Sequence, residues 1–181
     1  MPNRTVADYV VEQLAAWGVR NIYGVPGDAI LPFLHAVSRN PQLNFISVKH
    51  ENAAALMASA EAKLMGRLGV CIGTSGPGVA NLINGLADAK SDQVPVLVIT
   101  GQVDSYNIDT EYKQVIDQSL LLAAVTGYSG LVVAPDACND ILVKALRMAV
   151  VEGTATHVGF VKDVWQLPTE EAVRSPEPYL K

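Results

Sequence analysis

Apolar residues follow two alternating patterns along this chain. In the first pattern they recur every three or four positions, which predicts helices. These segments are residues 5–17, 28–40, 51–64, 75–90 and 135–149. In the second pattern, short runs are apolar almost throughout, which is typical of strands buried on both faces. These runs are residues 21–25, 43–48, 69–74, 96–100, 128–133 and 157–161.

Two segments interrupt the alternation. Residues 101–117 are polar and predict a loop, which a short helix over 117–124 follows. From residue 166 onward, three prolines predict an extended segment. We therefore expect one domain over residues 1–165 and a linker over residues 166–181 that leads toward a further, central domain.

The order of the predicted elements indicates the fold class. Strands that are apolar on both faces and separated by helices predict a mostly parallel sheet covered on both sides. We expect an α/β, doubly wound, three-layer α/β/α domain with about six strands and right-handed crossovers. Each parallel strand then ends at the same edge of the sheet, where such folds bind ligands.

Composition narrows the functional classes. The 181 residues are 50% apolar and 17% charged, which excludes a disordered chain. A net charge of −5 with scattered signs argues against a nucleic-acid surface. No apolar run approaches the roughly 18–20 residues that span a bilayer, and no signal peptide is evident. Two cysteines among apolar residues indicate a cytoplasmic protein with reduced thiols. The mean hydropathy of +0.24 is high, which predicts surface buried against another domain or chain.

Three strand-to-helix turns carry the candidate chemistry. They are Gly-Val-Pro-Gly-Asp at 24–28, Lys-His-Glu-Asn at 49–52 and Gly-Thr-Ser-Gly-Pro-Gly at 73–78. Glycines at such a turn let a ligand reach backbone N–H groups and the positive end of a helix. The third turn matches neither the dinucleotide nor the P-loop spacing, so a tight turn with only a packing role stays open. We expect Asp28 to cap the helix that follows the first turn.

Glu51 is the candidate proton carrier. A carboxylate at a helix start commonly serves the helix dipole. The residues after it are unusually apolar, and burial there would favour the protonated carboxyl group and suit it to proton transfer near neutral pH. His50 is a second candidate carrier, or a structural group. The three histidines lie on separate elements and have no metal-ligand spacing, so we expect no metal site.

Together the turns resemble the N-terminal, pyrimidine-binding domain of thiamine-diphosphate enzymes of the pyruvate oxidase, acetolactate synthase and benzoylformate decarboxylase type. The matching segments are Tyr-Gly-Val-Pro-Gly-Asp at 23–28, Val-Lys-His-Glu-Asn-Ala-Ala at 48–54, Thr-Ser-Gly-Pro-Gly-Val-Ala-Asn at 74–81 and Val-Leu-Val-Ile-Thr-Gly-Gln at 96–102. Their order and spacing agree with the family over residues 5–167. The pyruvate oxidases are the most similar branch, with the acetolactate synthases next.

The resemblance implies an activity on 2-oxo acids such as pyruvate. It assigns to Glu51 the role of the glutamate that touches the aminopyrimidine ring and drives its tautomerisation, which activates the cofactor. It implies cofactor-binding roles for six further residues. Thr74, Pro77 and Asn81 would line the pyrimidine pocket, Pro26 and Gly27 would border the thiazolium and substrate side, and Gln114 would lie near the reacting centre. Many relatives have Phe-Gln-Glu where this chain has Lys113-Gln114-Val115, which leaves the substrate unassigned.

The resemblance also implies missing parts. Relatives bind the diphosphate through Mg²⁺ held by a separate domain with a Gly-Asp-Gly motif, and this sequence has no such motif. The chain is then a fragment of a larger enzyme or the small subunit of a split decarboxylase. Family members pair these domains as homodimers, and some bind FAD through another domain. A non-catalytic assembly or regulatory module that retains the fold is the alternative function.

Overall fold

The computed structural model describes residues 4–179 and contains a six-stranded sheet in which every neighbouring pair is parallel. The strand order is β2-β1-β3-β4-β6-β5. The strands are β1 (Asn21–Gly24), β2 (Asn44–Ser47), β3 (Gly69–Gly73), β4 (Val96–Gln102), β5 (Tyr128–Val132) and β6 (Ala155–Val161). The predicted α/β class with about six strands is confirmed.

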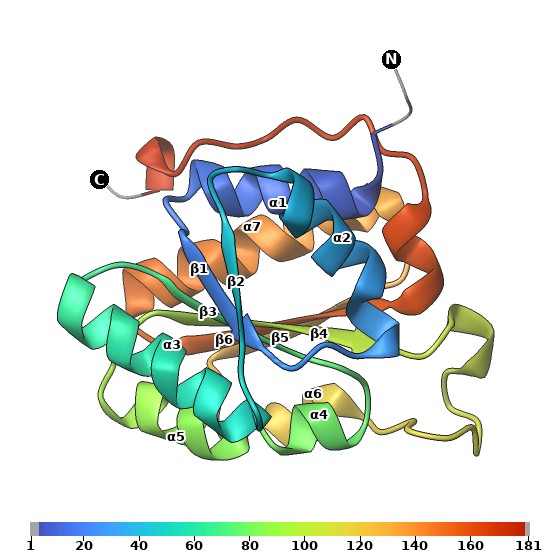
Figure 1. Cartoon of the computed structure of the whole chain (residues 1–181), viewed down its shortest axis with the longest axis horizontal. Coiled ribbons are helices and arrows are strands. Elements are labelled where there is room, and N and C mark those ends of the chain that lie inside the picture. The colour runs from blue at the N-terminus through green and yellow to red at the C-terminus, as the bar shows by residue number, and fades with distance from the viewer. Residues whose placement is uncertain (1–3, 180–181) are drawn as a thin grey trace.

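Helices cover both faces of the sheet, as Figure 1 shows. One layer contains α1 (Val6–Ala16), α2 (Leu31–Arg39) and α7 (Pro135–Glu152). The opposite layer contains α3 (Glu51–Met65), α4 (Pro77–Ala80), α5 (Ile83–Ser91) and α6 (Gln118–Leu122). The three-layer architecture is therefore also confirmed.

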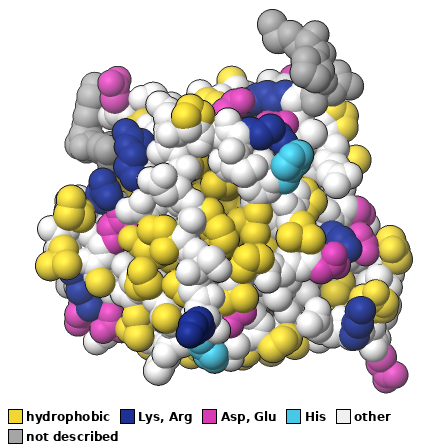
Figure 2. All heavy atoms as spheres, in the orientation of Figure 1, with side chains coloured by type: hydrophobic (Ala, Val, Ile, Leu, Met, Phe, Trp, Pro, Cys, Tyr) yellow, Lys and Arg dark blue, Asp and Glu magenta, His cyan; other side chains and the backbone are white. Residues whose placement is uncertain are grey.

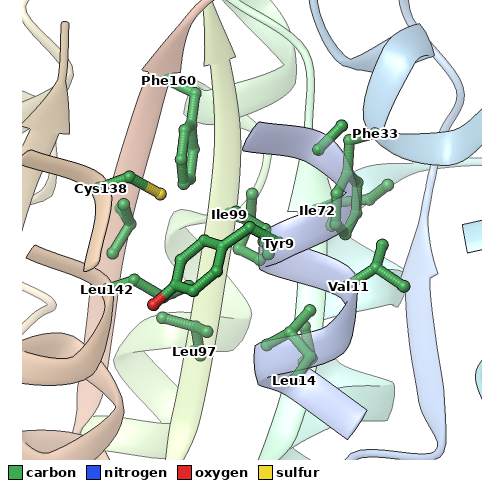
Figure 3. Packing of buried hydrophobic residues seen from close by; sticks show 14 of the residues in the cluster. Tyr9, Val11, Leu14, Phe33, Ile72, Leu97, Ile99, Cys138, Leu142 and Phe160 are labelled. Atoms are coloured by element: carbon green, nitrogen blue, oxygen red, sulfur yellow. The ribbon is translucent and has the colours of Figure 1, made fainter. Parts of the chain in front are cut away.

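The central strands are buried on both faces because successive side chains enter different cores. In β4, Leu97 and Ile99 join the core beneath α1, α2 and α7, whereas Val96 and Val98 join the core beneath α3 and α5. Figure 3 shows Leu97 and Ile99 near Tyr9 of α1 in the first core. This side-chain alternation explains why the strand sequences are apolar throughout rather than at every second position.

Helix boundaries follow local chemistry. Thr5 begins α1 with a capping box, in which its side chain and that of Asp8 exchange hydrogen bonds with each other's backbone N–H groups. Gly66 and Gly153 end α3 and α7 in the left-handed conformation. Two predictions were wrong here. The helix expected over 75–90 is divided into α4 and α5, and Asp28 begins a 3₁₀ turn (Asp28–Ile30) without capping it.

The proline-containing segment after residue 166 lies along α1 and is not detached from the domain (Figure 1). The backbone N–H of Val6 donates to Leu167 O at 3.0 Å. The buried Gln13 side chain donates to Arg174 O at 2.8 Å and accepts from Arg174 N at 2.9 Å. The rings of Trp17 and Tyr179 stack at 6.0 Å between centroids. Hydrogen bonds and this stacking hold the segment against α1.

Two further observations concern the character of the chain. Cys71 and Cys138 are buried and free, as predicted. Burial raises the pKa of both thiols, that of Cys138 to about 12, so neither is a reactive thiolate. Across residues 4–179, no helix is both long and apolar enough to cross a membrane.

Candidate functional site

The strand order brings the three strand-to-helix turns singled out in the sequence to one place. β2 lies on one side of β1 and β3 lies on the other, so the chain reverses direction across the sheet between β1 and β3. Ligands in open α/β sheets bind at such a switch point, beyond the carboxyl ends of the strands. The turns after β1, β2 and β3 are the segments that the sequence singled out, and they surround this point.

Glu51 is the first residue of α3, and only 8% of it is exposed. Its carboxylate is held by Asn81, whose side-chain amide donates to Glu51 Oε2 at 2.9 Å. The other oxygen, Oε1, accepts no hydrogen bond from any residue between 4 and 179. The carboxyl group is thus oriented by one oxygen, and the other remains available to a ligand.

The division between α4 and α5 falls at Asn81. Asn81 lies at the end of α4, a single turn that begins at Pro77. Gly78, in the same turn, faces the carboxylate: a Cβ placed there would lie 3.3 Å from Glu51 Oε1 and 3.0 Å from Thr74 Cγ2. A glycine at this position therefore leaves space directly beside the free carboxylate oxygen.

Gly27 and Thr74 meet across the switch point. A Cβ on Gly27 would lie only 2.4 Å from Thr74 Cβ, so no larger residue fits without movement of the threonine. Thr74 is half-buried, whereas Pro26 is exposed. The structure thus brings Gly27, Thr74, Glu51 and Asn81 together, as the sequence predicted for turns at adjacent strand ends.

Gln114 and Pro77 lie beside this cluster and border a groove of about 620 Å³. The groove is mainly apolar and extends along the loop that precedes α6 and along α6 itself. Gln114 has a positive φ of 66°, which is unusual for a residue with a side chain. Its backbone passes close to Gly76, where a Cβ would lie 3.0 Å from Gln114 Cα. The loop therefore lies directly against the third turn.

Charged residues border the outer side of the site. Lys162, after β6, donates to Asp28 at 2.6 Å, and this ion pair raises the pKa of the lysine. Both residues, together with Lys113 and Asp104, line a small cavity of about 70 Å³ beside Gln114. Nothing in the spacing of the sequence points to Lys162, because it is 134 positions from Asp28 and only the sheet brings the two together.

His50 serves the backbone in this structure. Its Nδ1 accepts from the backbone N–H of Asn52 at 3.2 Å and thereby caps α3. The side chain is exposed, and its hydrogen bond is to the helix that Glu51 begins. This contact matches the structural alternative for His50 that the sequence left open.

The fold and this cluster agree with the comparison with known families. The model of the family described as "Thiamine pyrophosphate enzyme, N-terminal TPP binding domain" matches residues 4–121. This chain therefore belongs to that family, and the expected resemblance is confirmed. The match contains all seven residues proposed for the site.

Curated relatives have similar sequences over most of this chain. Pyruvate oxidase of Lactiplantibacillus plantarum is 35% identical over 173 residues, which are 94% of this chain and 29% of the relative. The protein YdaP of Bacillus subtilis is 42% identical over 82% of this chain and 26% of its own length. The large subunit of acetolactate synthase isozyme 2 of Escherichia coli is 41% identical over 79% of this chain and 26% of its own length. The chain thus spans less than a third of these relatives.

Proposed function

We propose that this chain is the pyrimidine-binding domain of a thiamine-diphosphate enzyme that cleaves or condenses 2-oxo acids such as pyruvate. One observation carries the proposal: Glu51 is buried, Asn81 holds one of its carboxylate oxygens, and the other oxygen accepts no hydrogen bond from the described residues. A buried carboxyl group with one free oxygen is suited to share a proton with a ring nitrogen. The named functions of the pyruvate oxidase and acetolactate synthase relatives support this reading.

The residues around Glu51 fit a flat heteroaromatic ring. The missing side chain at Gly78 leaves space beside Glu51 Oε1, and a Cβ there would fill it. Pro77 adds an exposed apolar surface next to the groove that Gln114 also borders. We assign Thr74, Pro77 and Asn81 to the aminopyrimidine side, as the family resemblance implies.

The cofactor, when bound, would supply a carbon nucleophile for chemistry at a 2-oxo group. The role of this chain is to manage a proton and to orient the ring. Glu51 Oε1 would hold or release the proton at the ring nitrogen. Asn81 keeps the carboxylate in one rotamer through its bond to Oε2. Gly27 and Gln114 would border the substrate side, where Lys162 and Asp28 form the outer charged pair.

Other parts of the active site would come from outside this chain. We propose that Mg²⁺ and the diphosphate are held by another domain of the same or a partner chain, and that FAD, where used, binds a further domain. Separately, α3 has an exposed apolar face. Leu56, Met57, Leu64 and Met65 of α3 are each at least 39% exposed. Figure 2 shows hydrophobic side chains gathered over this region of the surface.

We further propose that two copies of this domain pair in the assembled enzyme, and that it works in the cytoplasm. The apolar face of α3 supports the first proposal, because so much exposed apolar surface is typical of an interface. The two buried, unpaired cysteines support the second, because reduced thiols are usual in that compartment.

The test of the function is Glu51→Gln in the complete enzyme. Glutamine retains the size of the side chain but cannot exchange a proton, so we expect turnover and proton exchange at the reactive cofactor carbon to fall at least a hundredfold. Glu61→Gln is the matched control, since Glu61 is also 8% exposed on α3 but is paired with Arg67, at the far end of the helix. Near wild-type turnover and exchange in Glu51→Gln would overturn the proposal.

A further inference from the structure

A closed set of hydrogen bonds lies inside the domain, away from Glu51. Thr100 Oγ1 of β4 is 2.7 Å from His157 Nε2 of β6, and His157 Nδ1 is 2.6 Å from Ser129 Oγ of β5. Thr100 and Ser129 also form hydrogen bonds with α6. Thr100 Oγ1 bonds to Gln118 at 2.6 Å, and Ser129 Oγ bonds to Ser119 at 3.0 Å. His157 is 1% exposed. Its imidazole thus joins three strands to two consecutive residues of one short helix.

The direction of these hydrogen bonds follows from the number of protons. The amide nitrogen of Gln118 donates to Gly101 O at 2.8 Å, so its oxygen faces Thr100 and must accept. The single hydroxyl proton of Thr100 is therefore used, and His157 Nε2 has to donate to Thr100 Oγ1. In the neutral ring, Nδ1 then accepts from the Ser129 hydroxyl, so Ser129 Oγ has to accept from the Ser119 hydroxyl. Burial lowers the pKa of His157 to about 3, which keeps the ring neutral at physiological pH.

The same contacts anchor the loop that carries Gln114. Three consecutive residues at the carboxyl end of β4 bind Ile116 and Gln118. Thr100 and Gly101 bind the two ends of the Gln118 amide, and Gln102 Nε2 donates to Ile116 O at 2.9 Å. These anchors begin two residues after Gln114. The strained backbone of Gln114 needs such support, because its φ of 66° is unfavourable outside glycine.

The loop has room to move if the anchors fail. A cavity of about 230 Å³ lies beneath it, lined in part by Gln102, Gln118 and His157. Each of these buried polar side chains already bonds to protein atoms. The cavity is therefore space into which the loop could shift, and its buried polar groups are occupied without a ligand.

We propose that His157 is a positioning residue: its neutral imidazole, protonated on Nε2, locks α6 to the sheet and thereby holds Gln114 against the third turn. The importance of Gln114 rests on the function proposed above, whereas the proton arrangement and the anchoring of the loop do not. If Glu51→Gln retained turnover, the proposed function would be wrong. The two measurements below would still test the role of His157 independently of that result.

The first measurement is the tautomer of His157 in the unmodified chain. Nitrogen NMR of the ¹⁵N-histidine-labelled protein distinguishes a protonated Nε2 from a protonated Nδ1. We expect the Nε2–H form with no change between pH 8 and pH 5. Finding the Nδ1–H form, or a charged ring in this range, would overturn the proposal.

The second measurement is hydrogen–deuterium exchange of the backbone amides over residues 112–122. In His157→Leu we expect exchange there to be roughly tenfold faster than in the unmodified chain, because Thr100 and Ser129, which bind α6, lose their hydrogen bonds to the imidazole. In His157→Gln we expect most protection to return, since the glutamine amide reaches Thr100 and can donate to it. Rescue by glutamine separates a specific hydrogen bond from general packing.

Thr156→Val is the matched control. Thr156 neighbours His157 on β6 and is equally buried, but its hydroxyl bonds to Ala145 O of α7 on the other side of the sheet. We expect this variant to lose stability. We do not expect its amide exchange to become faster over residues 112–122 than over the rest of the chain. Equal exchange in this segment for Thr156→Val and His157→Leu would overturn the proposal. If His157→Leu does not fold, His157→Gln provides the test. Amide exchange over residues 112–122 of His157→Gln as fast as in the unfolded chain would overturn the proposal.

Discussion

Gly85 tests how closely α3 and α5 are packed. It lies in α5, where a Cβ would be 2.5 Å from Ala55 Cβ and 2.6 Å from the backbone nitrogen of Leu56. Carbon atoms in normal contact are about 3.5–4.0 Å apart, so Gly85→Ala requires the two helices to separate by about 1 Å. Because the second atom is backbone, no side-chain rotation relieves the overlap.

The expected cost of Gly85→Ala is the difference between two effects. Overpacking costs about 1–3 kcal/mol, and the better helix propensity of alanine returns roughly 0.5–1 kcal/mol. Since a whole helix must move, we expect a net loss of about 1–2 kcal/mol in the free energy of unfolding. For a chain of this size, this corresponds to a fall in Tm of roughly 2–8 °C.

Urea and thermal unfolding followed by circular dichroism measure this loss. Asn84→Ala is the control, because Asn84 is the exposed neighbour on α5 and the same alanine is introduced without overlap. We expect Asn84→Ala to be neutral or slightly stabilising. If Gly85→Ala unfolded at the same temperature as Asn84→Ala or above it, the close helix contact would not exist as described.

Three further predictions concern the tail, the pH dependence and the site. Gln13→Leu removes both hydrogen bonds to Arg174, and we expect it to lower the free energy of unfolding by about 2–3 kcal/mol and to expose the tail to proteolysis. The folded pKa of His157 is depressed to about 3, so its contribution to stability is fully present above the unfolded pKa of about 6.5 and is lost as the pH falls toward 3. His157→Gln should therefore reduce the slope of unfolding free energy against pH between 6 and 4.5, by up to about 1.4 kcal/mol per pH unit. Gly27→Ala places a Cβ 2.4 Å from Thr74 Cβ, and we expect it to weaken thiamine diphosphate binding by the complete enzyme at least tenfold, measured by calorimetric titration.

Each of these expectations has a clear contrary result. A Gln13→Leu chain whose tail resists protease as well as the unmodified chain would show that other contacts hold the tail. An unchanged slope in His157→Gln would show that the histidine is not buried as a neutral group. Cofactor affinity in Gly27→Ala equal to that of the unmodified enzyme would place the cofactor away from the Gly27–Thr74 contact.

The spacing of apolar residues predicted the helices and strands well. It predicted the boundaries between them less well. Buried strands and amphipathic helices have different spacings of apolar residues, so their order was evident. The division of one predicted helix at Asn81 was not, because apolar spacing continues through it from Val79 to Leu86. In the tertiary structure, the side chain of Asn81, which lies at this division, binds Glu51, 30 positions away.

The candidate site also has features that the sequence predicted and features that it did not. The turns containing Gly27, Glu51 and Thr74 were predictable as one cluster, since parallel strands end at the same edge of a sheet. The pairing of Lys162 with Asp28 was not predictable from spacing. The prolines after residue 166 likewise predicted a linker. Only the folded chain shows that Gln13 binds this segment.

By itself, the sequence determined the α/β class, the number of strands and the three turns that surround the candidate site, because these depend on residue spacing and on short glycine-containing motifs. The tertiary structure alone decided which turn residues touch and what supports them. From the sequence, His157 was one histidine on the last strand, and nothing indicated its hydrogen-bond partners. Only the strand order β4-β6-β5 places it between Thr100 and Ser129, where it can direct the hydrogen bonds that anchor α6. Contacts across the sheet depend on strand order, and local periodicity contains no information about that order.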